Sequence, residues 1–537
     1  MAQNLEMEEK ATGDHMEWTV KSEMELAAGS DDNVSMWQLM KKNNWAILYC
    51  CLMSISPMVF GFDVITVGIV TAMPAFQESF GTLTDGTYLL PAMWLSLWTT
   101  MMPVGMMFGS LSGSFTTDRF GTRWSIMLGG LFAVAGALLT LFSDRLPDLE
   151  SRRGLFTGSK VVLGWGLGFM LPASQTYVSE VAPVRLRGAL LSFFTISMNT
   201  LGHLFFQTLT TLVQLIGQII AVAGIDVRLL NYTPSSYRVL FAVELVPTGL
   251  SIIAAIFCPE SPAIYAKLGK RVQAICAYTR IFSSEGAEEA VTKIESSLEH
   301  ERQAQVNDEA PSYIECFRGT NWRRTRVVIY ANMLQNFVGV AMVNQCTYFM
   351  ELGGMSPYIS LNVTTALLCV ALPGYISSWY TMNVYGRRNV MLCASTAIGV
   401  LWLVIGIMGC FGAEKIFWTI GCLIVVINFV YAMGVGSVYP VVASETSTLR
   451  LRAKTQAIGF CVQFLTTWAF GFSVPYMYTT DEGDLGGKVG FIFGFLSVVA
   501  WVVIYLEVPE MMGRTIADID ELFERKTATK DFRKTVL

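Results

Sequence analysis

Two long apolar segments are joined by the hexapeptide Asp118-Arg119-Phe120-Gly121-Thr122-Arg123, and this arrangement occurs twice in the chain. The second copy, Asn383-Val384-Tyr385-Gly386-Arg387-Arg388, begins 265 residues later and again joins two apolar segments. A glycine flanked by basic residues at the same place in both copies indicates that the chain is an internal duplication.

A second motif repeats at the same spacing and supports the duplication. Glu180 and Arg187 follow one apolar segment, and Glu445 and Arg452 follow another segment 265 residues further along. We therefore expect two pseudo-symmetric bundles of six helices, an arrangement that suits alternating access to a central site. A duplicated helical body without transport activity would show the same repeat, and this alternative stays open.

The segments around the repeats are long enough to cross a bilayer. A membrane helix needs about 20 mainly apolar residues, and roughly twelve such segments can be counted along the chain. We therefore predict an all-α membrane protein with twelve transmembrane helices in two pseudo-symmetric six-helix bundles. The segments lie near residues 45–71, 88–113, 124–144, 155–178, 189–222, 239–258, 326–350, 361–382, 389–411, 416–440, 456–476 and 488–507.

Composition excludes several other classes of protein. The chain has 537 residues, of which 53% are hydrophobic and only 15% are charged, against about 25% charged in soluble domains. Its mean hydropathy is +0.47, which argues against a mainly disordered chain. The net charge of -5 argues against general nucleic-acid binding.

No motif for catalysis, a metal or a cofactor is visible. The 11 cysteines show no spacing typical of a zinc site or a disulfide framework. The GxGxG run at Gly164, Gly166 and Gly168 lies inside an apolar segment, where it predicts close helix packing instead of phosphate binding. We expect no enzyme activity and no cofactor. The expected partners are a small-molecule solute, the proton and the lipid bilayer.

The distribution of polar segments predicts five regions. A disordered tail of residues 1–43 precedes a helical bundle of residues 44–258. A linker of residues 259–325 with short helices leads to the second bundle, residues 326–508, and a tail of residues 509–537. Arginine and lysine concentrate in the linker and in alternate loops, so the positive-inside rule places both termini in the cytoplasm. The sequons at Asn231 and Asn362 would then lie near the outer face as glycosylation sites.

The charged residues of both repeats are candidates for a cytoplasmic gate. Carboxylate–guanidinium pairs at the helix ends would hold the two bundles together in the outward-open state, and opening inward would break them. Exposed pairs contribute only about 0–1 kcal/mol each, but several together can set a balance of a few kcal/mol. The alternative is that these charges only enforce topology. The candidate residues are Asp118, Arg123, Glu180, Arg187, Arg387, Glu445 and Arg452.

With these motifs the chain resembles the major facilitator superfamily, specifically its sugar porter family, over residues 45–525. The fragments Pro74-Ala75-Phe76-Gln77 and Asn344-Gln345-Cys346-Thr347-Tyr348-Phe349 are most similar to the fungal maltose permease branch of α-glucoside:proton symporters. The further shared fragments are Gly61-Phe62-Asp63, Tyr177-Val178-Ser179-Glu180-Val181-Ala182-Pro183, Pro259-Glu260-Ser261-Pro262, Val508-Pro509-Glu510 and Gly513-Arg514-Thr515.

Three ionisable residues lie within apolar segments, where charge is unfavourable and indicates function. Asp63 lies in the first segment, Lys160 in the fourth and Glu244 in the sixth. If Asp63 and Lys160 approach and separate during the cycle, the proton affinity of Asp63 changes with conformation. The resemblance implies that Asp63 takes the proton and that Lys160 replaces the family's arginine partner. Two alternatives stay open: a static Asp63–Lys160 pair, and a Glu244 that faces water near the outer surface.

The seventh segment is rich in amides that are suited to hydrogen-bonding a sugar. Gln335 and Asn344 lie about 180° apart on a straight helix, so both can face one cavity only if the helix is broken, and Gly339 is the expected place. The resemblance implies an interrupted seventh helix whose paired amides, here Gln335 and Asn336, hold the sugar. The full candidate set for the substrate is Gln335, Asn336, Asn344, Tyr348, Asn199 and Tyr439.

Two departures from the family pattern bear on the substrate. The resemblance implies a glutamine where this chain has Thr195, and a tryptophan where it has Pro440 beside Tyr439. We predict a proton-coupled importer of an α-glucoside or hexose in the plasma membrane. The alternatives are a transporter of a non-sugar organic solute, which the two departures favour, and a non-transporting nutrient receptor.

Overall fold

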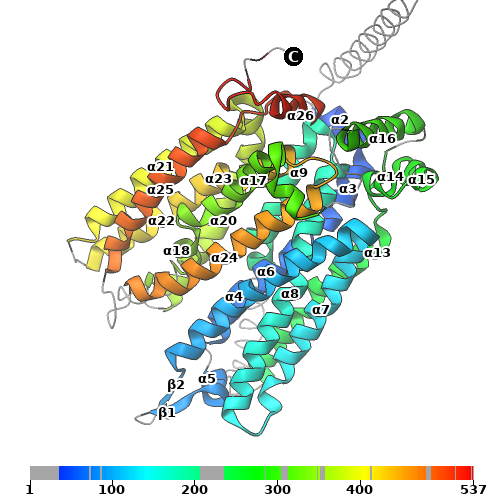
Figure 1. The fold of residues 1–537 in the computed structure, drawn as a ribbon. Helices are drawn as coiled ribbons and strands as arrows, with labels where there is room; N and C mark the ends of the chain where they lie inside the picture. The colour runs from blue at the N-terminus through cyan, green and yellow to red at the C-terminus, as the bar shows by residue number, and fades with distance from the viewer. Residues whose placement is uncertain are drawn as a thin grey trace, which may run out of the picture.

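The computed structural model is built of long helices that run side by side in two groups (Figure 1). Among the described residues, eight helical stretches are long and apolar enough to cross a membrane. The structure describes residues 36–71, 74–84, 87–205, 235–282, 284, 286–303, 312–346, 349–350, 357–411, 414–478, 485–514, 516–533 and 535.

The N-terminal bundle contains the first six expected spans. The second, third and fourth spans are single helices, whereas the first and sixth are each divided by a short turn. For the fifth span the described residues end at 205. The helices are α3 (Asn44–Met53), α4 (Ser56–Val70), α6 (Ala92–Phe120), α7 (Thr122–Phe142), α8 (Leu149–Val181), α9 (Val184–Ile196) with the π-helical turn η2 (Ser197–Leu201), α12 (Ser235–Val243) and α13 (Leu245–Phe257).

The C-terminal bundle contains the last six spans, so the prediction of two helical bundles with the major facilitator architecture is confirmed. The seventh and tenth spans are each broken into two helices. The helices are α17 (Gly319–Phe337), α18 (Val340–Asn344), α20 (Pro357–Tyr385), α21 (Arg387–Met408), α22 (Glu414–Met433), α23 (Val435–Thr446), α24 (Arg452–Tyr478) and α25 (Val489–Glu507).

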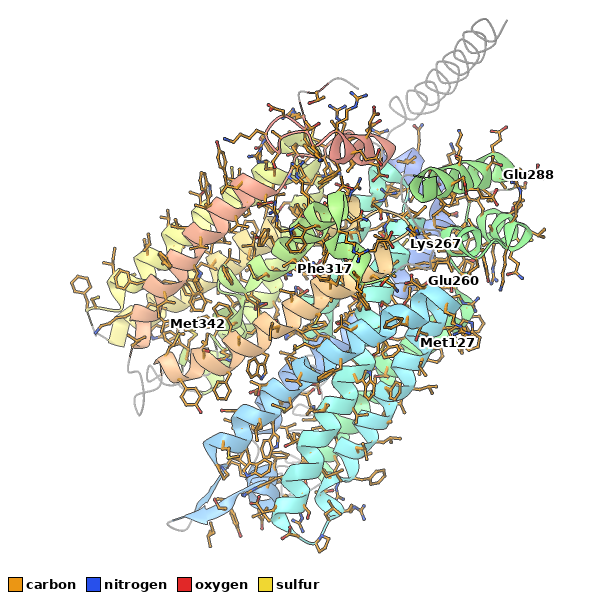
Figure 2. The ribbon with its side chains drawn as sticks, in the orientation of Figure 1. Met127, Glu260, Lys267, Glu288, Phe317 and Met342 are labelled. Atoms are coloured by element: carbon orange, nitrogen blue, oxygen red, sulfur yellow. The ribbon has the colours of Figure 1, made fainter. Side chains whose placement is uncertain are left out.

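The helices of the linker and of the C-terminal segment gather at one end of the molecule, which we call the linker face (Figure 1). It carries the linker helices and the C-terminal helix, and in Figure 2 Lys267 and Glu288 mark it while Met342 lies away from it. Short helices in the linker are therefore present as expected. The elements are α14 (Pro262–Lys267), α15 (Arg271–Ile281), α16 (Ala287–Gln303), η3 (Ile314–Phe317) and α26 (Ile516–Glu524).

Some local structure differs from the expectation. Residues Met36–Lys42 form helix α2, so the prediction of a disordered tail is wrong for this part of residues 1–43. A helix α5 (Pro74–Phe80) and a hairpin of strands β1 (Thr82–Thr84) and β2 (Thr87–Leu89) connect the first two spans. Aromatic side chains stabilise this region, because Phe76 and Phe80 pack on Trp98 with centroids 5.6 and 6.0 Å apart.

The glycine run in the fourth span packs helices together as predicted. A Cβ atom on Gly164 would lie 2.2 Å from the carbonyl oxygen of Met102 in α6, and one on Gly166 would lie 2.4 Å from the carbonyl oxygen of Gly129 in α7. Backbones this close leave no room for a side chain. The run therefore lets α8 contact α6 and α7 backbone to backbone.

In both bundles a glutamate carboxylate caps the helix that begins within the repeated hexapeptide. Glu260 accepts hydrogen bonds from the backbone N–H groups of Thr122 and Arg123 at 3.2 and 3.1 Å. Glu510 accepts them from Arg387 and Arg388 at 3.0 and 3.1 Å. A carboxylate at a helix N-terminus satisfies free N–H groups and complements the helix dipole. Each acid therefore fixes the start of α7 or α21.

The glycine of each hexapeptide is required by the same device. Gly121 and Gly386 have φ angles of 104° and 86°, which side chains rarely adopt. A Cβ atom there would lie 2.2 Å from a carboxylate oxygen of Glu260 or 2.3 Å from one of Glu510. The carboxylate thus occupies the space that the missing side chain leaves.

The break in the seventh span occurs at Gly339, as predicted. Gly339 has a φ angle of 92° and separates α17 from α18. The indole N–H of Trp402 donates to the carbonyl oxygen of Val338 at 2.9 Å, and a Cβ atom on Gly339 would lie 2.6 Å from the Trp402 ring. Trp402 on α21 therefore satisfies the broken helix end and holds the kink in place.

We expect the Glu510→Ala substitution to destabilise the C-terminal bundle. It leaves two backbone N–H groups at the start of α21 without a buried acceptor, a loss of about 1–3 kcal/mol. The thermal unfolding midpoint of the detergent-purified protein should fall by a few degrees. Glu289→Ala, which removes an exposed carboxylate from α16, is the matched control and should leave the midpoint unchanged. Equal midpoints for the two variants would contradict the capping role.

Candidate functional site

A buried ion pair lies in the core of the N-terminal bundle. The Lys160 ammonium group on α8 donates a hydrogen bond to the Asp63 carboxylate on α4. Asp63 is 1% exposed and Lys160 is 0% exposed, and the Phe156 ring lies 5.5 Å from the ammonium nitrogen. The sequence predicted this partnership, and the structure brings the two residues into contact.

Glu244 completes this group as a second acid. It is 0% exposed, and both of its carboxylate oxygens lack a hydrogen-bond partner within the described part of the chain. Its charged neighbours are Asp63 and Lys160. The alternative in which Glu244 faces water is therefore wrong, because the turn between α12 and α13 points it into the bundle. We call Asp63, Lys160 and Glu244 the charge trio.

A second polar group lies where the two bundles meet, around Gln335 of α17. The Tyr431 hydroxyl of α22 donates to the Gln335 amide oxygen at 2.9 Å, and the amide nitrogen donates to the Asn332 carbonyl at 3.3 Å. Tyr439 of α23 is fully buried beside Gln335, with Thr195 and Gln463 as further polar neighbours. Side chains from both bundles therefore share one polar centre.

The other predicted substrate residues are placed differently. Asn336 turns to α24, where its amide donates to the Thr466 hydroxyl at 2.9 Å, so the two adjacent amides contact different neighbours. Asn199 donates to the Tyr375 hydroxyl of α20 at 3.4 Å across the bundle interface. Asn344 on α18 is exposed. Tyr348 lies outside the described residues.

Sequence reasoning missed two tyrosines of this centre. The candidate set contained Tyr439 but neither Tyr375 nor Tyr431, which are 1% and 4% exposed. It was built from the amides of the seventh span, from Asn199 and from the positions next to the family's sugar-binding residues. The signal that could have found the two others is a tyrosine in the middle or at the end of an apolar stretch of α20 or α22.

At the linker face one ion pair joins the two bundles directly. The Lys454 ammonium group of α24 donates to the Asp118 carboxylate of α6 at 2.5 Å. The same nitrogen lies 4.8 Å from the Phe115 ring and 5.2 Å from the ring of Tyr313 in the linker. Lys454 was not among the predicted gate residues, because it has no acidic or basic counterpart at the repeat spacing.

Most of the predicted gate residues pair within one bundle and not across the interface. Arg387 pairs with Glu445 at 3.1 Å, and Glu180 pairs with Lys267 of α14 at 3.6 Å. Arg123 donates to the carbonyl of Ala255 at 2.9 Å and so satisfies the end of α13. The expectation of direct carboxylate–guanidinium pairs between bundles is thus corrected, since Glu180 and Glu445 find cations on their own side and Asp118, which does pair across the interface, contacts an ammonium group.

Arg187 nevertheless brings the two halves into electrostatic contact. The pKa of its guanidinium is lowered to about 10. Burial is the largest cause, repulsion from Arg452 and Arg387 adds to it, and attraction to Glu445 acts in the opposite direction. Arg452 itself is buried and donates to the Ser447 carbonyl at 3.4 Å. Arg187 of the N-terminal bundle therefore forms one charged cluster with Arg387, Glu445 and Arg452 of the C-terminal bundle.

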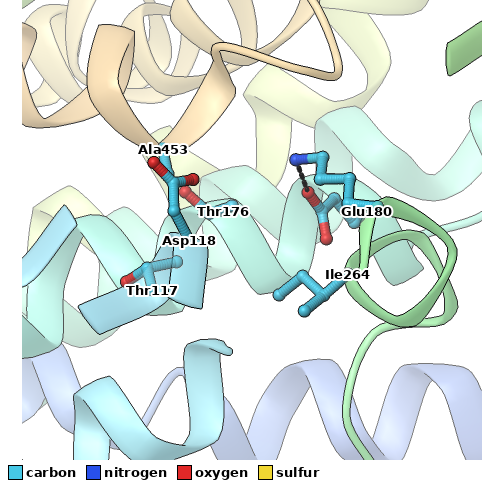
Figure 3. A pocket seen from close by; sticks show the side chains of 7 residues that line it. Thr117, Asp118, Thr176, Glu180, Ile264 and Ala453 are labelled. Atoms are coloured by element: carbon cyan, nitrogen blue, oxygen red, sulfur yellow. Dashed lines mark ion pairs between the residues drawn. The ribbon is translucent and has the colours of Figure 1, made fainter. Parts of the chain in front are cut away.

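A small cavity of about 10 Å³ lies between Asp118 and the Glu180–Lys267 pair (Figure 3). Asp118 and Glu180 line it from the N-terminal bundle, Lys267 from the linker and Ala453 from α24. A volume of this size admits about one water molecule. The cavity therefore marks a tight contact of both bundles with α14.

The glycosylation candidates stay predictions. Asn231 lies outside the described residues, and Asn362 lies in the second turn of α20.

Known proteins resemble the chain over nearly its whole length. The "MFS transporter fmqE" of Aspergillus fumigatus is 29% identical over 529 residues, covering 94% of this chain and 92% of that protein. The "General alpha-glucoside permease" of Saccharomyces cerevisiae is 27% identical over 524 residues, covering 95% and 80%.

A solved structure gives the fold independently. The proton:xylose symporter XylE of E. coli matches with a TM-score of 0.76 at 20% identity, covering 90% of this chain and all of that chain. This likeness identifies the major facilitator fold. The family model described as "Sugar (and other) transporter" matches residues 49–523. The chain is therefore a multi-pass membrane protein that belongs to the Sugar (and other) transporter family.

Proposed function

We propose that the protein is a proton-coupled secondary transporter that imports a sugar, an α-glucoside or a hexose, by alternating access. The charge trio of Asp63, Lys160 and Glu244 is the observation that carries the proton coupling. The related α-glucoside permease and the proton:xylose symporter support sugar as the solute. We place the protein in the plasma membrane with both termini and the linker face in the cytoplasm, as the distribution of basic residues indicates.

The charge trio needs one proton to be neutral. Two ionised carboxylates and one ammonium group carry a net charge of −1, which is unfavourable in a buried site because ions lose their hydration there. A proton on either acid removes that charge. Since Asp63 and Lys160 lie on different helices of the bundle, a movement that separates them changes which protonation state is stable. Proton uptake and release are thereby coupled to conformation.

The polar centre supplies the chemistry that a sugar requires. The amide groups of Gln335, Asn199 and Gln463 can exchange their present hydrogen bonds for those of sugar hydroxyls, and the amide oxygen of Gln463 is buried without a partner among the described residues. The rings of Tyr375 and Tyr439 offer apolar faces beside these groups. Residues of both bundles contribute, so a bound solute is released only when the bundles rearrange.

The linker face supplies the balance between open and closed states. The Asp118–Lys454 pair and the hydrogen bond from Gln175 to Gln456 at 2.9 Å hold the bundles together there. The guanidinium cluster around Arg187 opposes this attraction. Attraction and repulsion of similar size leave a difference of a few kcal/mol, which binding of solute and proton is able to reverse.

Uptake measurements in a yeast host that lacks sugar transporters test the function directly. Cells that express the protein should accumulate radiolabelled maltose or glucose, and a protonophore should abolish accumulation because it removes the proton gradient. Cells with an empty vector are the control. If neither sugar is taken up while another organic solute is, the substrate class is wrong. If sugar enters but the protonophore has no effect, the coupling is wrong.

We expect the Asp63→Asn variant to lose accumulation against a gradient while it retains counterflow exchange of sugar. The amide cannot take a proton, but Lys160 keeps Glu244 as a counterion, so the bundle should still fold. Asp144→Asn is the matched control, because Asp144 also forms a pair, with Arg238 at 2.5 Å, outside the charge trio. Unchanged accumulation in Asp63→Asn would remove its role in coupling.

The linker-face pair should control the fraction of molecules that open inward. Lys454→Gln leaves the Asp118 carboxylate without its cation, and because Lys454 is buried the loss exceeds the roughly 1 kcal/mol of an exposed pair, so the inward-open fraction should rise at least about five-fold. Labelling of a cysteine placed behind the gate reports this fraction. The exchange variant Asp118→Lys with Lys454→Asp restores attraction and should restore the fraction. If the exchange variant labels as fast as Lys454→Gln, the pair does not hold the gate.

A further inference from the structure

A basic pocket of about 380 Å³ opens at the linker face, away from the charge trio and the polar centre. It lies between the second turn of α17, the last turn of α25 and the segment that follows α26. Four cationic side chains and one carboxylate line it, which gives a net charge of +3 when all are ionised. The charged lining residues are Arg323, Arg326, Lys526, Lys530 and Glu507.

The two arginines are held in place by the protein. Arg323 donates to the Thr527 carbonyl at 2.7 Å and to the Thr529 hydroxyl at 3.2 Å, so it ties α17 to the segment after α26. Arg326 pairs with Glu507 at 2.9 Å, and its Nε atom is buried without a hydrogen-bond partner in the described residues. The Glu507 carboxylate is therefore the single negative charge among four cationic side chains in the lining of the pocket.

Lys526 reaches the pocket through a strained backbone. Its φ angle is 53°, and among the described residues it is the only one other than glycine with a positive φ. The N–H groups of Lys526 and Thr527 bond to the carbonyls of Phe523 and Leu522 at 3.1 Å each, a helix end at which glycine is usual. A lysine adopts this conformation less readily than glycine, which points to a use for its side chain.

The pocket borders the surface that faces lipid. Leu506 lines it and is 56% exposed, and Phe495 and Val498, earlier on α25, are also exposed. Trp501 stacks on Tyr505 at 5.3 Å, and the Lys530 ammonium group lies 4.7 Å from the Tyr505 ring. Tryptophan and tyrosine gather at the level of lipid headgroups. The cations therefore lie where the headgroups of one leaflet lie.

We propose that this pocket binds the phosphate-bearing headgroup of an anionic phospholipid. Guanidinium groups match phosphate oxygens in geometry, and lysines near the surface attract anionic lipid. Free phosphate has the same charge, but the lipid-facing Leu506 at the rim favours a headgroup whose acyl chains run along α25. The bound headgroup would clamp the segment after α26 onto α17 and α25. The site does not depend on which solute is transported.

Lipid binding by the purified full-length chain tests the proposal. The protein is placed in nanodiscs of phosphatidylcholine alone or with phosphatidylinositol 4-phosphate, and the thermal unfolding midpoint is measured as the anionic lipid is titrated. The midpoint should rise with the lipid because a ligand stabilises the state that binds it. Lys526→Gln with Lys530→Gln should weaken the apparent affinity roughly 30-fold. Lys270→Gln with Lys293→Gln, an equal change at exposed lysines of the linker, should leave it unchanged.

A glycine variant separates binding from folding. Lys526→Gly relieves the strained backbone, so the protein in phosphatidylcholine should unfold at or above the wild-type midpoint, while its affinity for the anionic lipid should fall roughly five-fold. Inorganic phosphate at millimolar concentration should not reproduce the lipid effect. Equal affinities of the pocket and linker variants would overturn the proposal. An equal effect of inorganic phosphate would overturn the lipid as the ligand.

Discussion

The contact between Asp63 and Lys160 is the interaction on which the mechanism depends. Both groups are withdrawn from water, and removing one partner of a buried pair leaves a charge whose isolation is unfavourable by about 3–5 kcal/mol. The bundle therefore cannot separate the two residues unless a proton or Glu244 compensates. This constraint makes the helix arrangement depend on protonation.

The linker face acts in a different way. Its charges are largely buried where the bundles meet, and in the proposed cycle attraction at Asp118 competes with repulsion among the arginines around Glu445. A buried charge group in one bundle and balanced charges between bundles suit a transporter. In the proposed cycle the first ties the proton to the conformation, and the second keeps both conformations accessible. The capping acids Glu260 and Glu510 keep the helix ends rigid, so the bundles can move as bodies.

Local chemistry made several features predictable. The duplicated hexapeptide indicates two bundles because its glycine and its charges serve the same cap in each. Gly339 was expected to break the seventh span, since amides on opposite faces of a straight helix cannot share a cavity. The contact between Asp63 and Lys160 was expected because ionisable groups inside a membrane need partners. The partner of Asp118 was not expected, because Lys454 comes from the other bundle and the choice depends on how the bundles meet.

The sequence by itself determined the twelve-span architecture, the helix break at Gly339 and the residue types that enter the membrane, because hydrophobic length and backbone conformation are local properties. Only the tertiary structure decided which charges meet. It turned Glu244 inward, directed Asn336 and Gln335 to different neighbours, and gathered tyrosines from three helices around the centre. Distance and burial set the strength of an electrostatic interaction, and both arise only when distant segments pack together.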